Sequence, residues 1–226
     1  MCGRVTLPET EVIVKELGVK YEAETFPANI NVPPTLQVPV LTNTKPDTLQ
    51  YFTWSLIPSF SKTGKADFKM STFNATIERL EESNLWKPLL GKRHCVVITD
   101  GFYEWQYDDP IKKKGSHPHL IKAKDSRFTY MAGLWSAWAN KETGELIPSC
   151  TIITLPANFL MSKIHNTKGR MPAFLTLESS KIWLDNELSY NERKLALDPV
   201  PDEFLNTYMV SKVGDQEEYS KLINVC

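Results

Sequence analysis

The sequence of 226 residues lacks any long apolar run, which excludes a membrane-spanning helix. No stretch approaches the roughly 18 consecutive apolar residues that such a helix needs. The first ten residues, MCGRVTLPET, also lack the apolar core that a secretory signal requires. We therefore expect a protein that stays in the cytoplasm.

Cysteine is scarce as well. The four thiols, at Cys2, Cys95, Cys150 and Cys226, are too widely spaced for a disulfide framework or a structural zinc site. The histidines show no metal-ligand spacing either, so the sequence indicates no metal and no cofactor. Two of the thiols, Cys95 and Cys150, stand in apolar runs and are expected to be inert core residues, and Cys226 is expected to be dispensable.

An excess of charge of one sign is also missing, since the formal net charge is -1. Residues 1–172 nevertheless carry 21 basic and 17 acidic side chains, whereas residues 173–226 carry 5 basic and 10 acidic ones. General electrostatic adhesion to nucleic acid is therefore excluded, while a local basic face is not. Any nucleic-acid binding should be modest and directed to a site.

Linkers, internal repeats and low-complexity segments are absent too, which favours one domain over residues 1–226. Helical signals occur at Pro8–Leu17, near Asn74–Leu80 and Leu85–Leu90, at Asn158–Lys163, and at Leu177–Leu184 and Asn191–Leu195. Strand signals occur at 36–42 and 50–54, in CVVIT, FYEW, HLIKA, FTYMAGLW and TIITL, and in YMVSKV near the end. The sequence therefore predicts an α+β fold with a sheet-dominated middle.

The placement of Cys2 is the first chemical signal. Removal of Met1 would leave a residue that carries an α-amine, with an ordinary pKa of about 7.7–8.0, and a thiol, with one of about 8.5. These groups can attack one aldehyde carbon in sequence, because the amine forms a Schiff base and the thiol then closes a five-membered thiazolidine ring. The alternative interpretation is a frayed terminus with an incidental cysteine.

Glu104 lies in the aromatic stretch GFYEW. Period-two alternation predicts Phe102 and Glu104 on one face of a strand and Tyr103 and Trp105 on the other. A carboxylate in that position could transfer protons. The alternative is a rim carboxylate paired with a lysine.

His165 lies in KIHNTKGRMP, after a short helical stretch and among basic side chains. An imidazole can donate and accept protons near neutral pH, and its basic neighbours could hold a phosphate. A structural or surface histidine is the alternative.

Asn74 precedes a helical pattern that contains Glu78, which is the composition of a helix N-terminal cap. Its amide could equally serve as a neutral hydrogen-bonding clamp. Trp105, next to Glu104, could stack on a base.

Several motifs together resemble one known family. In chain order they are MCGR, NVPPT, WSLIP, FNA, GFYEW, AGLW, IIT, IH and RMP, from Met1 to about Ala173. This order is similar to that of the SRAP (SOS response-associated peptidase) family. The resemblance implies twisted, mostly antiparallel β-sheets of barrel-like form with short flanking helices, followed by a C-terminal helical part and final strand in residues 174–226.

The resemblance also implies a function in DNA repair. Members of this family recognise an abasic site in single-stranded DNA and cross-link to it covalently, with autopeptidase and abasic-site lyase chemistry as related activities. Carried over by motif, Cys2 would form the thiazolidine after Met1 is released, and Asn74 would orient the open sugar. Glu104 would move protons during Schiff-base formation, and His165 would assist sugar ring opening and crosslink reversal.

The DNA contacts that the resemblance implies are mostly basic. Arg4 and Arg170 are candidate phosphate contacts, and Lys168 is a substitute for Arg170. Two departures affect this set: Thr76 stands where the family usually has an arginine, and Asn166–Gly169 separates His165 from Arg170, where the family commonly has one residue. The expected partner is single-stranded DNA with an abasic site, bound by a monomer at the nucleoid.

Two other functions compete with this interpretation. One is an N-terminal-nucleophile glutamine amidotransferase, which also begins with Met-Cys-Gly, although the downstream motifs that hold glutamine are not found. The other is a non-catalytic single-stranded DNA-binding module with an incidental cysteine.

Overall fold

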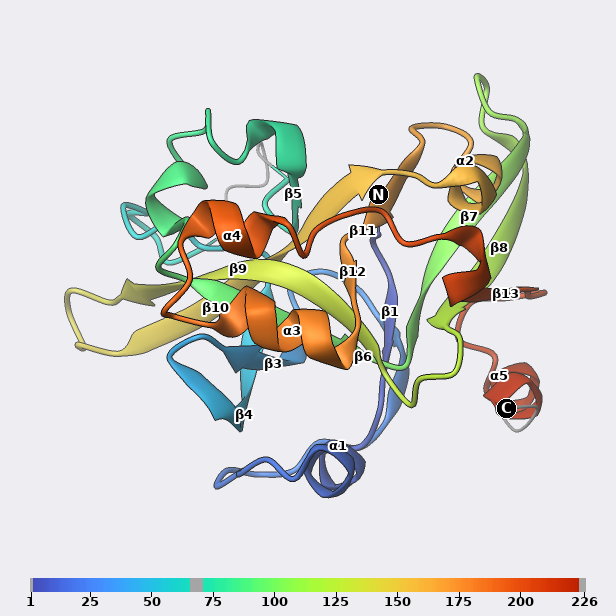
Figure 1. Cartoon of the computed structure of the whole chain (residues 1–226). Coiled ribbons are helices and arrows are strands. Elements are labelled where there is room, and N and C mark those ends of the chain that lie inside the picture. Colours follow the sequence, from blue (N-terminus) through green and yellow to red (C-terminus); the bar gives the residue numbers. More distant parts are fainter. Residues whose placement is uncertain (1, 66–70, 224–226) are drawn as a thin grey trace.

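The computed structural model describes residues 2–65 and 71–223 (Figure 1). Met1 and Cys226 therefore lie outside the described residues. No helix in these two ranges is long and apolar enough to cross a membrane.

The centre of the fold is a ring of five strands, in which each strand pairs with the next and the last pairs with the first. In ring order they are β10 (Leu146–Pro156), β4 (Lys45–Trp54), β3 (Gln37–Thr42), β6 (His94–Thr99) and β9 (Thr129–Ala139). All of these pairings are antiparallel except β10 with β4. The expectation of a barrel-like, mostly antiparallel α+β fold is confirmed.

Three short strands extend the ring. They are β5 (Asn74–Thr76), which runs parallel to β10, β11 (Arg170–Pro172), which pairs with β10, and β12 (Phe174–Leu175), which pairs with β9. Every residue of β6 is buried, as its run of apolar and β-branched side chains predicts. Trp54 and Trp183 are among the largest fully buried side chains of the core.

A second sheet lies beside the ring (Figure 1). Its strand order is β13 (Leu205–Met209), β8 (Lys114–Ala123), β7 (Gly101–Asp109), β1 (Val5–Leu7) and β2 (Asn29–Val32). The alternation predicted for β7 is confirmed, because Phe102 joins the main core whereas Tyr103 and Trp105 pack in a smaller cluster with Leu120 and Val210.

The helices are short and lie around these sheets (Figure 1). They are α1 (Thr10–Leu17), α2 (Phe159–Ile164), α3 (Leu177–Leu184), α4 (Tyr190–Lys194) and α5 (Gln216–Ile223), with single 3-10 turns at Ile77–Arg79, Lys87–Leu89 and Asp202–Phe204. The predicted stop of the first helix is confirmed, since Gly18 caps it with φ 64°. The predicted helix at Leu177–Leu184 is also confirmed, and a capping box at Thr176 and Ser179 starts it.

Three sequence expectations are wrong in part. Asn74–Leu80 is not helical, because Asn74–Thr76 pairs with β10 and only one 3-10 turn follows. Leu85–Leu90 forms a single 3-10 turn around Pro88, which lacks the N–H that a longer helix would use. The expected strand YMVSKV ends at Met209, and the last described element is α5, which was not predicted.

His94 is a fully buried titratable group of the barrel wall, with no exposed surface. Its Nε2 accepts a hydrogen bond from the Gly91 N–H at 2.8 Å, and its Nδ1 donates to the Trp183 carbonyl at 3.2 Å. Burial lowers its pKa to about 3. The imidazole is therefore neutral in the folded protein across the physiological range.

This burial predicts a pH dependence of stability. Between pH 6.5 and about pH 3 the unfolded chain binds a proton at His94 that the folded chain does not, so the free energy of unfolding should fall as the pH falls. At pH 4.5 the loss should be about 2–3 kcal/mol relative to pH 7. Denaturant titrations of wild type and His94→Gln test this, since the variant should lose that part of the pH slope. Equal slopes between pH 7 and 4.5 would contradict the assignment.

Candidate active site at the N-terminal cysteine

Cys2 is placed by the pairing of β1 with β7. Val5 lies opposite Phe102, and the Tyr103 N–H donates to the Arg4 carbonyl at 2.8 Å. The chain before β1 therefore continues antiparallel to the part of β7 that carries Glu104. Cys2 is 1% exposed and belongs to the main core, so it is not a frayed terminus.

Asn74 holds Cys2 from the barrel side. Its backbone pairs with Ile152 in β10, and its Nδ2 donates to the Cys2 carbonyl at 2.7 Å. The helix-cap interpretation is therefore wrong, and the amide acts as a clamp on Cys2. The Asn74 Oδ1 is buried and has no hydrogen-bond partner among the described residues, so it offers an unused acceptor beside Cys2.

Glu104 and His165 come together from different elements. Glu104 lies in β7, its Oε1 accepts a hydrogen bond from the Trp105 N–H at 3.2 Å, and its Oε2 lies 3.8 Å from the His165 Nδ1. His165 directly follows α2 as its C-terminal cap, and its side chain is 3% exposed. Its Nδ1 lies 2.8 Å from the Arg170 carbonyl and 3.3 Å from the Arg170 N–H. A carbonyl can only accept, so the shorter contact favours a proton on Nδ1 and leaves Nε2 as the basic nitrogen.

The negative charge of Glu104 raises the pKa of both of its neighbours, Cys2 and His165. Burial raises the pKa of the Cys2 thiol well above its ordinary value, and the negative charge of Glu104 raises it further. Burial lowers the pKa of His165, while the charge of Glu104 opposes that change. At neutral pH the site therefore holds a protonated thiol beside a neutral imidazole.

The predicted DNA contacts divide into two groups. Arg170 is held within the protein, because its Nη1 lies 2.6 Å from Glu78 Oε1 and its Nη2 donates to the Thr154 carbonyl at 2.5 Å. Thr76, in β5, lies opposite Thr154 in the parallel pairing with β10. Lys168, by contrast, is exposed on the turn that follows His165.

Arg4 and Trp105 are close in sequence to two of the four central residues, Cys2 and Glu104. Arg4 is half-buried, and its Nε has no hydrogen-bond partner among the described residues. Trp105 is half-buried against the smaller cluster, on the opposite face of β7 from Glu104. The structure thus brings together Cys2, Asn74, Glu104 and His165, and it arranges the five other residues around them at different faces.

Sequence reasoning missed two residues that shape this site. Thr154 is fully buried and accepts the Arg170 guanidinium at its carbonyl, and Asn166 bonds the backbone of Tyr107 in β7. The signal for Asn166 was its position directly after His165, in the segment where the chain is longer than the family pattern.

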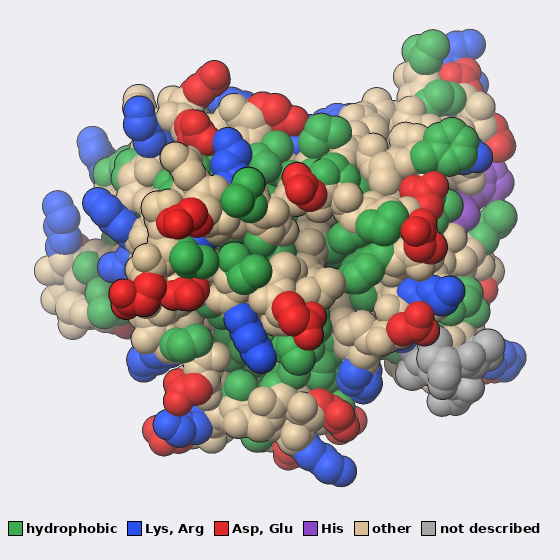
Figure 2. Space-filling model, in the orientation of Figure 1, with side chains coloured by type: hydrophobic (Ala, Val, Ile, Leu, Met, Phe, Trp, Pro, Cys, Tyr) green, Lys and Arg blue, Asp and Glu red, His purple; other side chains and the backbone are tan. Residues whose placement is uncertain are grey.

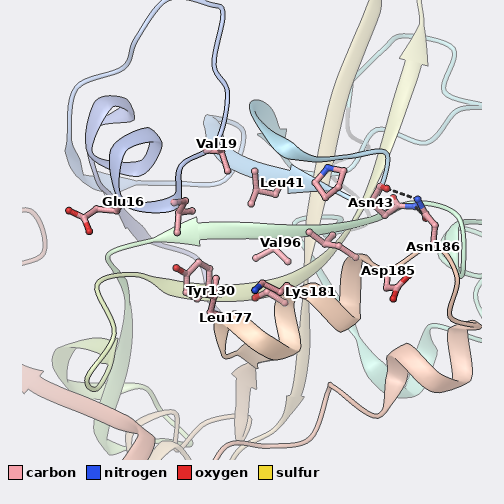
Figure 3. A pocket seen from close by; sticks show the side chains of 14 residues that line it. Glu16, Val19, Leu41, Asn43, Val96, Tyr130, Leu177, Lys181, Asp185 and Asn186 are labelled. Carbon is pink, nitrogen blue, oxygen red and sulfur yellow. Dashed lines mark hydrogen bonds between the residues drawn. The ribbon is translucent and has the colours of Figure 1, made fainter.

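A cavity of about 510 Å³ lies elsewhere, between α1, α3 and the barrel (Figure 3). Leu41 and Val96 line its apolar floor, and Asn43 and Asn186 are hydrogen-bonded to each other at one end. None of the nine predicted site residues lines it. In the two described ranges of the chain, no group of three or more His, Cys, Asp or Glu side chains could hold a metal ion.

The fold is thus a barrel that buries Cys2 beside the amide of Asn74, with the carboxylate of Glu104 and the imidazole of His165 close to it. The chain matches the family model of the SOS response associated peptidase (SRAP) over residues 1–215, and it belongs to this family. The resemblance found in the sequence is confirmed.

Curated relatives agree with this membership. The abasic site processing protein YobE of Bacillus subtilis (strain 168) is 34% identical and covers 96% of this chain and 98% of its own length. The abasic site processing protein YoqW of the same organism is 36% identical, with 94% of this chain and 93% of its own length covered. The abasic site processing protein HMCES of Xenopus tropicalis is 34% identical over 58% of this chain and 43% of its own length.

Solved structures share the fold. A protein from Bacteroides thetaiotaomicron superposes with a TM-score of 0.82 at 26% identity and covers 93% of both chains. A protein from Bordetella bronchiseptica gives a TM-score of 0.78 at 23% identity, covering 93% of this chain and 100% of its own.

Because the charge of Glu104 acts on His165, replacement of Glu104 should change the pKa of His165. In Glu104→Gln the negative charge that stabilises the imidazolium is lost, so the pKa of His165 should fall further below its ordinary value. A pH titration of the histidine ring resonances by NMR measures this. Asp108→Asn is the matched control, because Asp108 pairs with His117 and should leave the His165 midpoint unchanged. A His165 midpoint that stays or rises in Glu104→Gln would contradict the geometry.

Proposed function

We propose that this protein binds abasic sites in single-stranded DNA and forms a thiazolidine crosslink through Cys2 after Met1 is removed. The observation that carries the proposal is the arrangement around Cys2, whose backbone is clamped by Asn74 and whose thiol lies in the field of Glu104. The names of the full-length relatives support abasic-site DNA as the substrate class.

The proposed crosslinking has two bond-forming steps. The amine of Cys2 attacks the aldehyde carbon of the opened sugar, and loss of one water molecule gives a Schiff base. The thiol then adds to the imine carbon, and the proton of the thiol goes to the former amine nitrogen. The product is a five-membered ring, and one water molecule is the only by-product.

The raised pKa of the Cys2 thiol fits this order of events. A thiol that stays protonated at neutral pH is a weak first nucleophile, so the amine attacks first. Glu104 accepts and returns protons during loss of water and addition of the thiol, since its charge reaches both Cys2 and His165. The unused Asn74 Oδ1 accepts a hydrogen bond from the Cys2 amine or a sugar hydroxyl.

His165 has the second proton-transfer role. With its proton on Nδ1, the Nε2 lone pair can take the proton of the anomeric hydroxyl as the bond from that carbon to the ring oxygen breaks. The same proton then goes to the ring oxygen, so the sugar is left open with its aldehyde exposed. The reverse transfer assists reversal of the crosslink. Decay of the Schiff base by β-elimination would give strand cleavage, the lyase reaction that competes with ring closure.

Release of Met1 is an obligatory step in this proposal. It hydrolyses the Met1–Cys2 peptide bond and frees the amine that the ring contains. A retained or blocked amine cannot form the Schiff base. The buried thiol and the Glu104–His165 pair supply the nucleophile and proton carriers for autocatalytic release.

DNA contacts in the proposal are local. Lys168 is the exposed phosphate contact. Arg170 stays paired with Glu78 unless a phosphate takes the place of that carboxylate. Arg4 and Thr76 also contact the DNA backbone, and Trp105 provides an aromatic ring for stacking on a base. Basic and acidic side chains are interspersed on the face shown in Figure 2, which supports binding to a site rather than to a broad basic surface.

The central prediction concerns Cys2 itself. Wild type incubated with a single-stranded oligonucleotide that contains one abasic site should give a heat-stable shifted band on a denaturing gel, and Cys2→Ala should give none. Intact-mass measurement should show loss of Met1 and addition of the DNA less one water molecule. Cys226→Ser is the matched thiol control and should behave like wild type. Equal bands from wild type and Cys2→Ala would overturn the proposal, whereas DNA-independent release of ammonia from glutamine would indicate an amidotransferase.

The two proton carriers should affect rate rather than folding. Glu104→Gln and His165→Ala should each slow crosslink formation or reversal by roughly 100- to 10,000-fold, because general acid–base groups contribute factors of that order. Single-turnover gel assays measure both directions, and thermal melts check that the fold is kept. Wild-type rates in both directions for both variants would contradict the assigned roles.

A further inference from the structure

Asn166 is bound to β7 at two points. Its Nδ2 donates to the Tyr107 carbonyl at 2.7 Å, and its Oδ1 accepts from the Tyr107 N–H at 3.1 Å. A primary amide can satisfy a donor and an acceptor of the same backbone residue in this way, as a neighbouring strand would. The pair of bonds therefore acts as a clamp between the turn after α2 and the strand.

The clamp occupies an edge of β7 that no strand covers within residues 2–65 and 71–223. β1 pairs with β7 only at Gly101 and Phe102, and the Arg4 carbonyl adds one bond at Tyr103. Beyond that point β8 pairs with β7 on the other side, with Tyr107 opposite Ser116. Asn166 thus satisfies backbone groups on the open edge, three residues after Glu104.

The turn that carries Asn166 is closed by hydrogen bonds of its own backbone. The N–H groups of Lys168 and Gly169 both donate to the His165 carbonyl, at 3.3 and 2.9 Å. Gly169 adopts φ 56°, a conformation that favours glycine. The turn is thereby closed on His165, and the Asn166 side chain is the group that ties it to the strand of Glu104.

We infer that Asn166 is a positioning residue that sets His165 against Glu104 for the proposed crosslinking reaction, on which this inference rests. The two partners lie on separate elements, Glu104 in β7 and His165 at the end of α2, a helix of only six residues. The segment Asn166–Gly169, which lengthens the chain between His165 and Arg170, therefore has a function. It supplies the second attachment of the imidazole, beside the bond of Nδ1 to the Arg170 carbonyl.

The test uses two substitutions and one control. Asn166→Ala removes both bonds, and Asn166→Asp keeps the acceptor but replaces the donor by an oxygen that repels the Tyr107 carbonyl. Asn158→Ala is the matched control, because Asn158 caps the other end of α2 through Met161 and bonds the Val200 carbonyl. It should lower the melting temperature without separating His165 from Glu104.

Crosslinking should slow about 10- to 100-fold in both Asn166 variants, the usual effect of losing a residue that orients a reacting group. Affinity for an oligonucleotide with a tetrahydrofuran site, which has no aldehyde, should change less than twofold. The acidic limb of the rate–pH profile should move, because the pKa of His165 depends on its burial and on the charge of Glu104, and a displaced imidazole changes both. Asn158→Ala should keep the wild-type rate and profile.

Two outcomes would overturn the inference: wild-type rates in the Asn166 variants, or an equal loss in Asn158→Ala. The NMR titration of His165 keeps the test independent of activity. A shifted midpoint in Asn166→Ala supports the positioning role even if wild type forms no crosslink, a result that would reject the proposed function alone. An unchanged midpoint rejects the positioning role even if wild type crosslinks efficiently.

Discussion

The pairing of β1 with β7 is the interaction on which the site depends. It covers only Val5 opposite Phe102 and Thr6 opposite Gly101, yet both apolar members of the pair are fully buried. Because backbone groups of a buried strand must be paired, the first residues cannot leave the sheet without exposing unsatisfied donors and acceptors. A chain end that would ordinarily fray is therefore fixed beside Glu104.

The barrel strand β10 holds the opposite side of the same site. It pairs with β5, which carries Asn74, and with β11, which begins at Arg170 and follows the turn of His165. All four central residues thus depend on two strands, β7 and β10, that belong to different sheets. The arrangement places a carboxylate and an imidazole in a low-dielectric interior, where the charge of Glu104 opposes the fall in the pKa of His165 that burial causes.

Much of this fold could be predicted from local sequence, because the signals were strong and short in range. The cap at Gly18, the helix Leu177–Leu184 and the alternation in β7 all follow from neighbouring residues. Asn74 could not be placed in this way, since its partners Cys2 and Ile152 are about seventy residues distant in either direction and override its local preference for a helix cap. Strands as short as β1, β5 and β11 carry too few residues for a periodic pattern. The Asn166 clamp depends on an open strand edge that only the assembled sheet reveals.

Burial of Cys2 gives the proposed chemistry its order. An exposed thiol near its ordinary pKa would compete with the amine for the aldehyde and would be open to oxidation. A buried thiol beside the charge of Glu104 is held protonated, so it reacts only when a carbon is already bound next to it. The Schiff base provides that carbon, because the amine and the thiol belong to one residue and ring closure needs no further encounter. The backbone amine at position 2 therefore matters as much as the sulfur, and the clamp of Asn74 on the Cys2 carbonyl fixes the direction in which both point.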